Sequence, residues 1–356
     1  ESFFMAITNS SSKLWFVLQA TVWTICLVMV VLLFVKPEIG LHAFWDVLIP
    51  VAPALVALLP GVWRNICPTA AMSQLPRHLG ISKKRKMSVE THGWLVLLSV
   101  ILLFAIIPLR HTYFDLNGPA TGVFLIVSTL IAIVLASIYD GKSGWCASLC
   151  PVHQVEKLYG QKPIATVGNS HCSECSKCVT GCPDSTPSAS PHLGGRVWAR
   201  RAATFGLIGA FPGYVWGWFQ IQDYATLSAG LENIVNTYTI PIVGGAATLA
   251  LYALLISSVP LQKRKIIDRF FAAAAISCYY WYRIPWLFGF SQFEGNGMLV
   301  DLSDTISPTV MAIIPYVTTA FWVWWIALKR NGLRSWMIRP PDAQSTPGHV
   351  GITISA

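Results

Sequence analysis

Long apolar runs separated by shorter polar segments dominate this chain. A helix that crosses a bilayer needs about 20 predominantly apolar residues, and eight runs reach or approach that length. They cover residues 14–35, 41–62, 94–109, 120–139, 202–220, 239–259, 270–290 and 308–328. The run at 41–62 also contains Asp46 and three prolines, which predict a kinked or broken helix. The pattern therefore predicts an all-α integral membrane protein with about eight transmembrane helices.

The composition agrees with a membrane location. Hydrophobic residues make up 54% of the 356 positions, charged residues only 12%, and the mean hydropathy is +0.55. Soluble domains carry about 25% charged residues, so an ordinary soluble enzyme and a disordered chain are both excluded. The formal net charge is +9, which in a soluble protein would suggest nucleic-acid binding. Because basic residues collect in the cytoplasmic loops of membrane proteins, we expect the lipid bilayer as a partner and no nucleic acid.

The basic residues lie in alternate loops between the predicted helices. Of the 25 Lys and Arg residues, 21 fall in four segments, at 64–92, 140–201, 260–269 and 329–356. The positive-inside rule then places both termini and both long loops in the cytoplasm. The alternative has seven spans, with 270–290 in the membrane interface and the C-terminus outside.

Two basic features within this pattern have their own interpretations. Arg283, near one end of the run at 270–290, is expected to snorkel to the membrane interface. The basic run at 83–86 is expected to fix the topology, and the alternative is that it binds anionic lipid headgroups.

These features divide the chain into four parts. Residues 1–139 and 202–328 are predicted to form two membrane regions of four helices each. Residues 140–201 form a cytoplasmic loop, and residues 329–356 form a cytoplasmic tail. Six of the nine cysteines lie in that loop, between positions 146 and 182. Because the cytoplasm keeps thiols reduced, this clustering indicates metal binding rather than disulfides.

The string from Cys172 to Pro183 has the spacing C-x2-C-x2-C-x3-C-P, which is the bacterial ferredoxin run. Three closely spaced thiolates can hold three irons of one [4Fe–4S] cluster, and the fourth Cys of such a run ligates a second cluster. Zinc is the alternative, but zinc sites usually pair two short cysteine knuckles at a distance. We therefore expect a small ferredoxin-like iron–sulfur insert in the cytoplasmic loop.

A shorter string, C-A-S-L-C-P at 146–151, repeats the last half of the ferredoxin run. In two-cluster ferredoxins, each Cys-Pro cysteine ligates the cluster of the other motif. By this logic the ligands of the first [4Fe–4S] cluster are predicted to be Cys150, Cys172, Cys175 and Cys178.

The remaining cysteines predict a second site with fewer thiolates. Its cysteine ligands are predicted to be Cys67, Cys146 and Cys182, since Cys67 also precedes a proline and enters a cytoplasmic loop. The open candidates for its last ligand are His153, Asp140, water and a partner subunit. The alternative is a single cluster, with Cys67 and Cys146 as structural residues. Cys26 and Cys278 lie in the middle of predicted spans and are expected to be packing residues.

The residues at 146–151 and 172–183, and more weakly Cys67-Pro68, resemble those of the membrane polyferredoxin family. This family includes the ferredoxin-type quinol-oxidising subunit of periplasmic nitrate reductase, the nitrous oxide reductase regulatory protein and the cytochrome c oxidase accessory protein. The resemblance covers roughly residues 45–190 and departs from the family pattern, because a second full ferredoxin run is absent and Trp63 stands where Cys is expected. It implies [4Fe–4S] clusters in the inner (plasma) membrane of a prokaryote. These clusters would exchange electrons with a quinone or a cytoplasmic donor and with partner redox subunits.

We therefore expect a membrane-bound iron–sulfur electron-transfer subunit with no catalytic residue of its own. The alternatives are an assembly or maturation factor, which uses its cluster to reduce a metal or thiol, and a structural anchor of a larger complex. Haem is disfavoured because it needs an axial ligand, commonly His, and none of the eight histidines is central in a predicted span. His92 and His111, at opposite ends of one short span, are expected to be interface residues.

Overall fold

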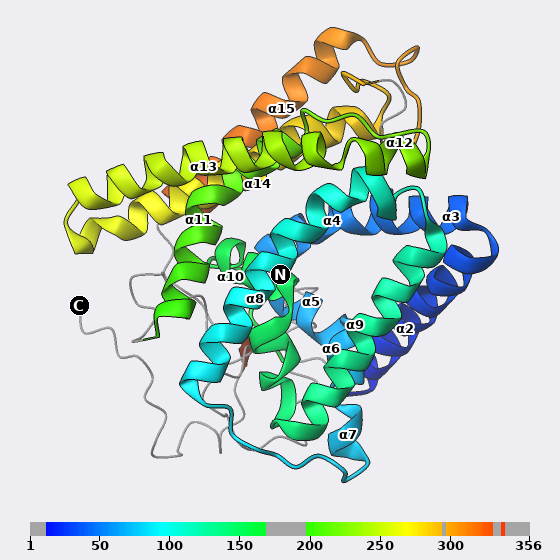
Figure 1. Cartoon of the computed structure of the whole chain (residues 1–356), viewed down its shortest axis with the longest axis vertical. Helices are drawn as coiled ribbons and strands as arrows, with labels where there is room; N and C mark the ends of the chain where they lie inside the picture. Colours follow the sequence, from blue (N-terminus) through cyan, green and yellow to red (C-terminus); the bar gives the residue numbers. More distant parts are fainter. Residues whose placement is uncertain (1–11, 169–196, 294–296, 330–335, 339–356) are drawn as a thin grey trace.

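The computed structural model describes residues 12–168, 197–293, 297–329 and 336–338 (Figure 1). The N-terminal half contains α2 (Ser12–Val35), α3 (Pro37–Leu41), η1 (His42–Leu48), α4 (Ile49–Leu58), α5 (Pro60–Ile66), α6 (Pro68–Met72), α7 (Leu75–His78), α8 (Val89–Leu109), η2 (Arg110–Phe114), α9 (Gly118–Ile138), η3 (Gly141–Ser143), η4 (Trp145–Leu149), α10 (Pro151–Tyr159) and β1 (Val167–Gly168). The C-terminal half contains α11 (Trp198–Trp218), α12 (Leu227–Glu232), α13 (Ile234–Ser258), η6 (Leu261–Lys263), α14 (Arg264–Leu287), α15 (Pro308–Trp322), η7 (Val323–Leu328) and β2 (Met337–Ile338). The described fold is therefore almost entirely helical.

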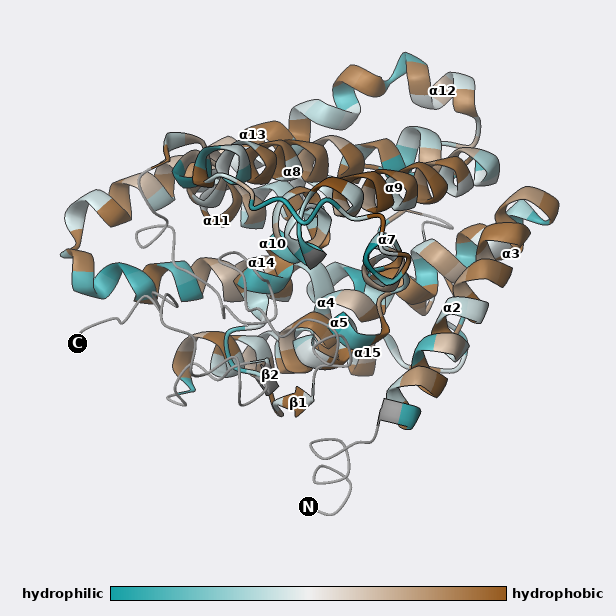
Figure 2. Ribbon diagram, turned by 90° about the horizontal axis from the view of Figure 1, so that it is seen from below, coloured by the Kyte–Doolittle hydropathy of each residue, from teal (hydrophilic) through white to brown (hydrophobic). Residues whose placement is uncertain are grey.

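Six helical segments are long and apolar enough to cross a membrane. They are Lys13–Val35, Pro37–Leu58, Val89–Phe114, Gly118–Ile138, Ile234–Ser258 and Pro308–Leu328. Figure 2 shows hydrophobic residues along most of α8, α9 and α13. α11 and α14 have 21 and 24 residues but are less apolar. The structure thus confirms an all-α membrane protein, while the count of eight spans remains a prediction.

The second apolar run is a broken helix, as its prolines predict. It passes from α3 through the π-helical segment η1 into α4, and the backbone leaves the helical region at Leu59 before Pro60 starts α5. A proline at the first helical position is favourable because its missing N–H has no intrahelical partner there. The break therefore ends the apolar segment and starts the short helix that leads to Cys67.

Glycines allow the two long helices α11 and α13 to pack closely. A Cβ atom added to Gly213 would lie 1.9 Å from the carbonyl oxygen of Gly244, which is far inside van der Waals contact. Close approach of helix backbones through small residues is a common way to pack helices in membranes. Across the same contact, the Thr248 hydroxyl lies 3.2 Å from the backbone nitrogen of Gly213, which donates to it. This crossing anchors the C-terminal half of the bundle.

α14 belongs to the helical bundle. It packs against α11 and α15 and buries Ala272, Ala273 and Ile276 completely. The helix is not among the candidate spans, so the choice between eight spans and seven stays a prediction.

α8 links two polar regions of the molecule. Its first turn is capped by Ser88, whose hydroxyl accepts the Thr91 N–H, and it packs near the start against η4 and α10. Its last residue leads directly into η2, which carries Arg110 and His111. At 1.5 Å per residue, the 21 residues of α8 separate these regions by about 30 Å. One region holds the cysteines and the other a network of buried charges.

A short parallel strand pair connects the C-terminal segment to the cysteine region. β1 and β2 pair through Val167 with Met337 and through Gly168 with Ile338. The indole of Trp336, just before β2, is 1% exposed and donates from Nε1 to the Gly160 carbonyl. Residues that follow the last helix therefore pack beside α10.

Candidate cysteine site and buried charge network

The ferredoxin run lies outside the described residues. Cys172, Cys175, Cys178 and Cys182 all fall between 169 and 196, so the ligand set predicted for the first cluster is not tested by the structure. Cys67, Cys146 and Cys150 are described, and the predicted site can be examined through them.

Cys67 and Cys150 occupy equivalent positions in the fold. Each immediately precedes a proline that begins a helix, α6 or α10, and their backbone angles are nearly equal, at φ −61°, ψ 118° and φ −69°, ψ 115°. Because the residue before a proline avoids the helical region, each Cys-Pro pair sets a turn into a helix. Both sulfurs therefore lie at helix N-termini, where the helix dipole favours the thiolate form.

The three described cysteines share one apolar cluster. Cys146 is buried in it with Trp145 and Leu149, while Cys67 and Cys150 pack against it. Cys146 lies on the π-helical segment η4, a rare geometry that often occurs at functional sites. The structure thus brings together three cysteines from two loops. The sequence grouped Cys67 with Cys146, but it assigned Cys150 to the other cluster.

Basic side chains surround these thiols. Burial, and to a smaller extent Glu156, raises the pKa of Cys67, while the Ala70 N–H, Arg64 and Lys142 lower it. Burial likewise raises the pKa of Cys150, with further increases from Cys146 and Cys67, while the His153 N–H and Arg64 oppose the rise. Arg64 is 3% exposed and Lys142 is 6% exposed, so both cations are inside the protein. Buried cations beside thiols fit a site that carries several negative charges.

The electropositive character extends along α10. Burial, followed by the charges of Arg200 and Arg64, lowers the pKa of Lys157 to about 7, although Glu156 opposes this change. Glu156 is itself buried and accepts from Arg64 at 3.1 Å. An anionic iron–sulfur cluster is compatible with these three cysteine thiols as ligands. It is also compatible with the basic side chains beside them, which outnumber the single carboxylate of Glu156.

The two side chains proposed as non-thiolate ligands differ in their surroundings. Asp140 accepts from Arg77 at 3.0 Å and so has a cationic partner already. His153 is 1% exposed, and its Nδ1 lies 3.0 Å from Glu156 and also contacts Arg64. Its Nε2 is buried and has no hydrogen-bond partner in the described part of the chain. His153 is therefore the better-placed ligand of the two. Within the described ranges, however, no three or more His, Cys, Asp or Glu side chains are arranged to hold a metal ion.

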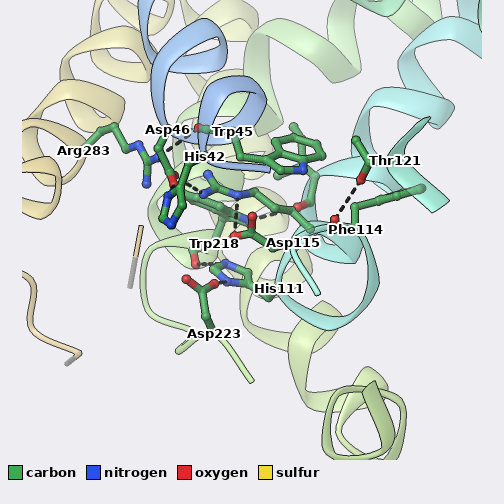
Figure 3. Close-up of polar contacts among 12 residues, drawn as sticks. His42, Trp45, Asp46, His111, Phe114, Asp115, Thr121, Trp218, Asp223 and Arg283 are labelled. Carbon is green, nitrogen blue, oxygen red and sulfur yellow. Dashed lines mark hydrogen bonds and ion pairs between the residues drawn. The ribbon is translucent and has the colours of Figure 1, made fainter. Parts of the chain in front are cut away.

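The second polar region is a network of buried charges (Figure 3). Asp46 on η1 accepts from Arg283 of α14 at 2.5 Å and from Arg110 of η2 at 3.0 Å. Arg110 also donates to Asp115 at 3.1 Å and lies between the rings of Trp45 and Trp218. These contacts join helices from both halves of the chain.

The structure corrects two expectations about this region. Arg283 does not snorkel, because it is 0% exposed and is held by Asp46 and the Trp45 carbonyl. His111 is not an interface residue, since it is also fully buried, against Trp218 and Asp223. Both errors have the same cause, because the partner residues lie more than 100 positions away along the chain. Asp46 inside an apolar run was the one sequence signal that pointed to a buried cation.

The packing cysteines lie where the sequence predicts. Cys26 packs against the cluster that contains Met29 and Phe44, and Cys278 packs against the largest apolar cluster of the bundle.

Comparison with known proteins gives a distant relative. A curated protein of Paracoccus denitrificans, described as "Methylamine utilization ferredoxin-type protein MauN", is 26% identical over 165 residues. The chain resembles a ferredoxin-type protein. The match covers 40% of this chain and 56% of MauN, so it spans only about half of that relative. No family model and no solved structure matches the chain. The similarity supports a ferredoxin-type relationship and suggests an electron-transfer role.

Proposed function

We propose that this chain is a membrane-bound electron-transfer subunit that carries [4Fe–4S] clusters at its cysteine site. The observation that carries the proposal is the convergence of Cys67, Cys146 and Cys150, from two separate loops, beside the buried cations Arg64 and Lys142. Iron–sulfur clusters are held by cysteine thiolates, and the ferredoxin run begins only a few residues after β1. The distant likeness to MauN, a ferredoxin-type protein, supports the same class of function.

The proposed ligands follow the exchange of Cys-Pro cysteines between two clusters. The first cluster takes Cys150, Cys172, Cys175 and Cys178, and the second takes Cys67, Cys146 and Cys182. Cys146 lies on η4 and Cys150 follows its last residue, only four positions later, so the two clusters would be neighbours. Neighbouring clusters form a path along which electrons move, and the bound clusters supply this one-electron chemistry.

The protein's own residues shape the site around the clusters. Arg64 and Lys142 offset the negative charge of the thiolates, and the helix N-termini at Cys67 and Cys150 act in the same direction. Trp145 and Leu149 exclude water from the sulfur atoms. A drier environment and fewer hydrogen bonds to sulfur change the reduction potential of such clusters.

The electron partners are proposed from the chemistry of the chain. The apolar helices place the protein in a bilayer, where a lipid-soluble quinone can carry electrons. Partner redox subunits would complete the electron-transfer path. We propose that the termini and the cysteine site face the cytoplasm, because the basic residues gather there.

The first experiment measures iron, acid-labile sulfide and the electron paramagnetic resonance signal of anaerobically purified protein. Cys172→Ser, Cys175→Ser and Cys178→Ser should each abolish the signal of the first cluster, because each thiolate holds one iron. Cys278→Ser, in a packing position of α14, is the matched control and should keep full iron content. Zinc without iron or sulfide in the intact protein would refute the proposal.

The second experiment tests how the cysteines are divided between clusters. Cys67→Ser and Cys146→Ser should remove one signal and leave the other, whereas a single-cluster protein would lose neither. Cys150→Ser should affect the cluster of Cys172, and Cys182→Ser should affect the other cluster. The opposite result for Cys150 and Cys182 would disprove the exchange while leaving an iron–sulfur protein intact.

Copurification separates the subunit from a maturation factor. A stoichiometric redox partner retained through purification supports the subunit. A partner bound only transiently, together with loss of metal from a separate enzyme when this chain is deleted, would support maturation instead.

A further inference from the structure

The side chain of His111 is placed between two oxygen acceptors (Figure 3). Its Nε2 lies 3.1 Å from the Trp218 carbonyl, and its Nδ1 contacts a carboxylate oxygen of Asp223. A carbonyl and an ionised carboxylate can only accept hydrogen bonds, while a neutral imidazole has a single N–H to donate. The arrangement therefore requires one further proton, carried by the second ring nitrogen or by the carboxyl group. In either case the pair holds one proton more than a neutral His and an ionised Asp.

The charges around the pair agree with this extra proton. The charged groups that face it are Arg110 beside it on η2, Arg283 from α14, Asp46 from η1 and Asp115 at the end of η2. Among the described residues, these two cations equal the two carboxylates in number, and the exposed His42 contacts Asp46 from outside. With the extra proton, the His111–Asp223 pair is neutral as a unit. Without it, the pair carries a net negative charge beside the fully buried imidazole, which is unfavourable.

Among the described residues, uncharged groups also pack against His111 and the segment that carries it. The ring of Trp218 packs over the imidazole, with ring centres 4.5 Å apart. α12 approaches η2 through Gly230, which packs against the backbone of Thr112. The phenol of Tyr279 adds a neutral group near Arg110. In the described part of the chain, the charges nearest the pair are therefore those of Arg110, Arg283, Asp46 and Asp115.

Asp223 connects the pair to the outside of the protein. Its side chain is 22% exposed, whereas that of His111 is 0% exposed. Burial raises the pKa of Asp223, but the hydrogen bond and charge of His111, together with the charges of Arg110 and Arg283, outweigh this and lower it. The carboxylate can therefore pass a proton between solvent and the buried ring.

We propose that the His111–Asp223 pair is a proton-binding site that exchanges its proton with solvent at the end of α8 remote from the cysteines. The ligand is H⁺, and no electron transfer is involved in its binding. Intramembrane ionisable residues commonly form proton relays. The inference is independent of the cluster assignment, since it uses contacts about 30 Å along α8 from the cysteine site.

The test uses the full-length protein in lipid bilayers with ¹⁵N-labelled histidine. Magnetic resonance at pH 8 should show one histidine with both ring nitrogens protonated, or one ring proton together with an infrared band of a protonated carboxyl group. His111→Gln identifies the signal by removing it. A neutral His111 with no protonated carboxyl group at pH 8 in the unaltered protein would overturn the proposal.

Variants of Asp223 provide the second arm. Asp223→Asn should reduce His111 to one ring proton at pH 8, because the new amide can donate to Nδ1. Asp223→Glu should restore the extra proton, which a purely structural role would not require. His78→Gln is the matched control, because His78 is an exposed histidine on α7, outside the charge network, and it should leave the signal unchanged. Persistence of the extra proton in Asp223→Asn would also contradict the proposal.

Discussion

Replacing Asp46 by asparagine should destabilise the folded protein by about 3–5 kcal/mol, the usual consequence of removing one partner from a buried ion pair. Asp46 is 5% exposed and accepts from two guanidinium groups, of which Arg283 is 0% exposed and Arg110 is 4% exposed. Asparagine keeps the shape of the side chain but removes its charge. Arg110 would then keep its bond to Asp115, whereas Arg283 would lose its bonded carboxylate and keep the bond to the Trp45 carbonyl.

The assay is equilibrium unfolding in mixed micelles of increasing denaturing detergent, followed by tryptophan fluorescence. His42→Gln is the control, because His42 contacts the same carboxylate at 2.7 Å but its side chain is 61% exposed. Exposed ion pairs contribute about 0–1 kcal/mol. The double variant Asp46→Asn with Arg283→Met should lose less than the sum of the single changes, by about 0.5–3 kcal/mol, because each removes the partner of the other. If Asp46→Asn costs no more than His42→Gln, the network does not hold the helices together and the reasoning fails.

Three further predictions concern packing and topology. Gly213→Ala should destabilise the α11–α13 crossing by about 1–3 kcal/mol. Gly206→Ala on the same helix has no atom within 4 Å of its added Cβ and should be neutral or stabilising by up to about 1 kcal/mol. Equal thermal unfolding temperatures of the two variants would contradict the close approach of α11 and α13. Trp336→Ala should expose Arg64 and His153, which it packs against at 5.5 and 6.0 Å, and should cost about 3–5 kcal/mol; unchanged unfolding and unchanged proteolysis would show that the contact is dispensable. Single cysteines placed near Asp223 and Asp301 in a background without the native exposed thiols should react with an impermeant reagent outside the cell, and reaction near Lys263 from that side would refute the predicted orientation.

The helices of this fold follow closely from the sequence. Every predicted span coincides with helical segments, and the break near Pro60 lies where the prolines of the second run place it. A membrane-spanning helix is specified by about 20 successive apolar residues, so it can be predicted from one continuous stretch of sequence. The convergence of Cys67 with Cys146 was also predictable, because both follow spans that end on the same side.

The charge network could not be predicted in the same way. Arg283 resembles a snorkelling residue in its own run, and only Asp46, 237 positions earlier, gives the reason for its burial. His111 depends likewise on Asp223, 112 positions later. Pairing between distant residues has no period or spacing in a single sequence. The β1–β2 contact, with two residues in each strand, is equally invisible to pattern analysis.

The pairing of β1 with β2 has a consequence for the order of events during synthesis. β1 ends just before the stretch that contains the ferredoxin run, yet its partner strand begins at Met337, after the last helix. At 5–20 residues per second, the ribosome needs roughly 10–30 s to travel from one strand to the other. During this interval Val167 and Gly168 lack their strand partner, and Trp336 is not yet available to cover α10. The cysteine region is therefore completed only after every membrane helix has been made. A chain truncated within its last helix would lack β2 and Trp336, and the packing beside α10 would be incomplete.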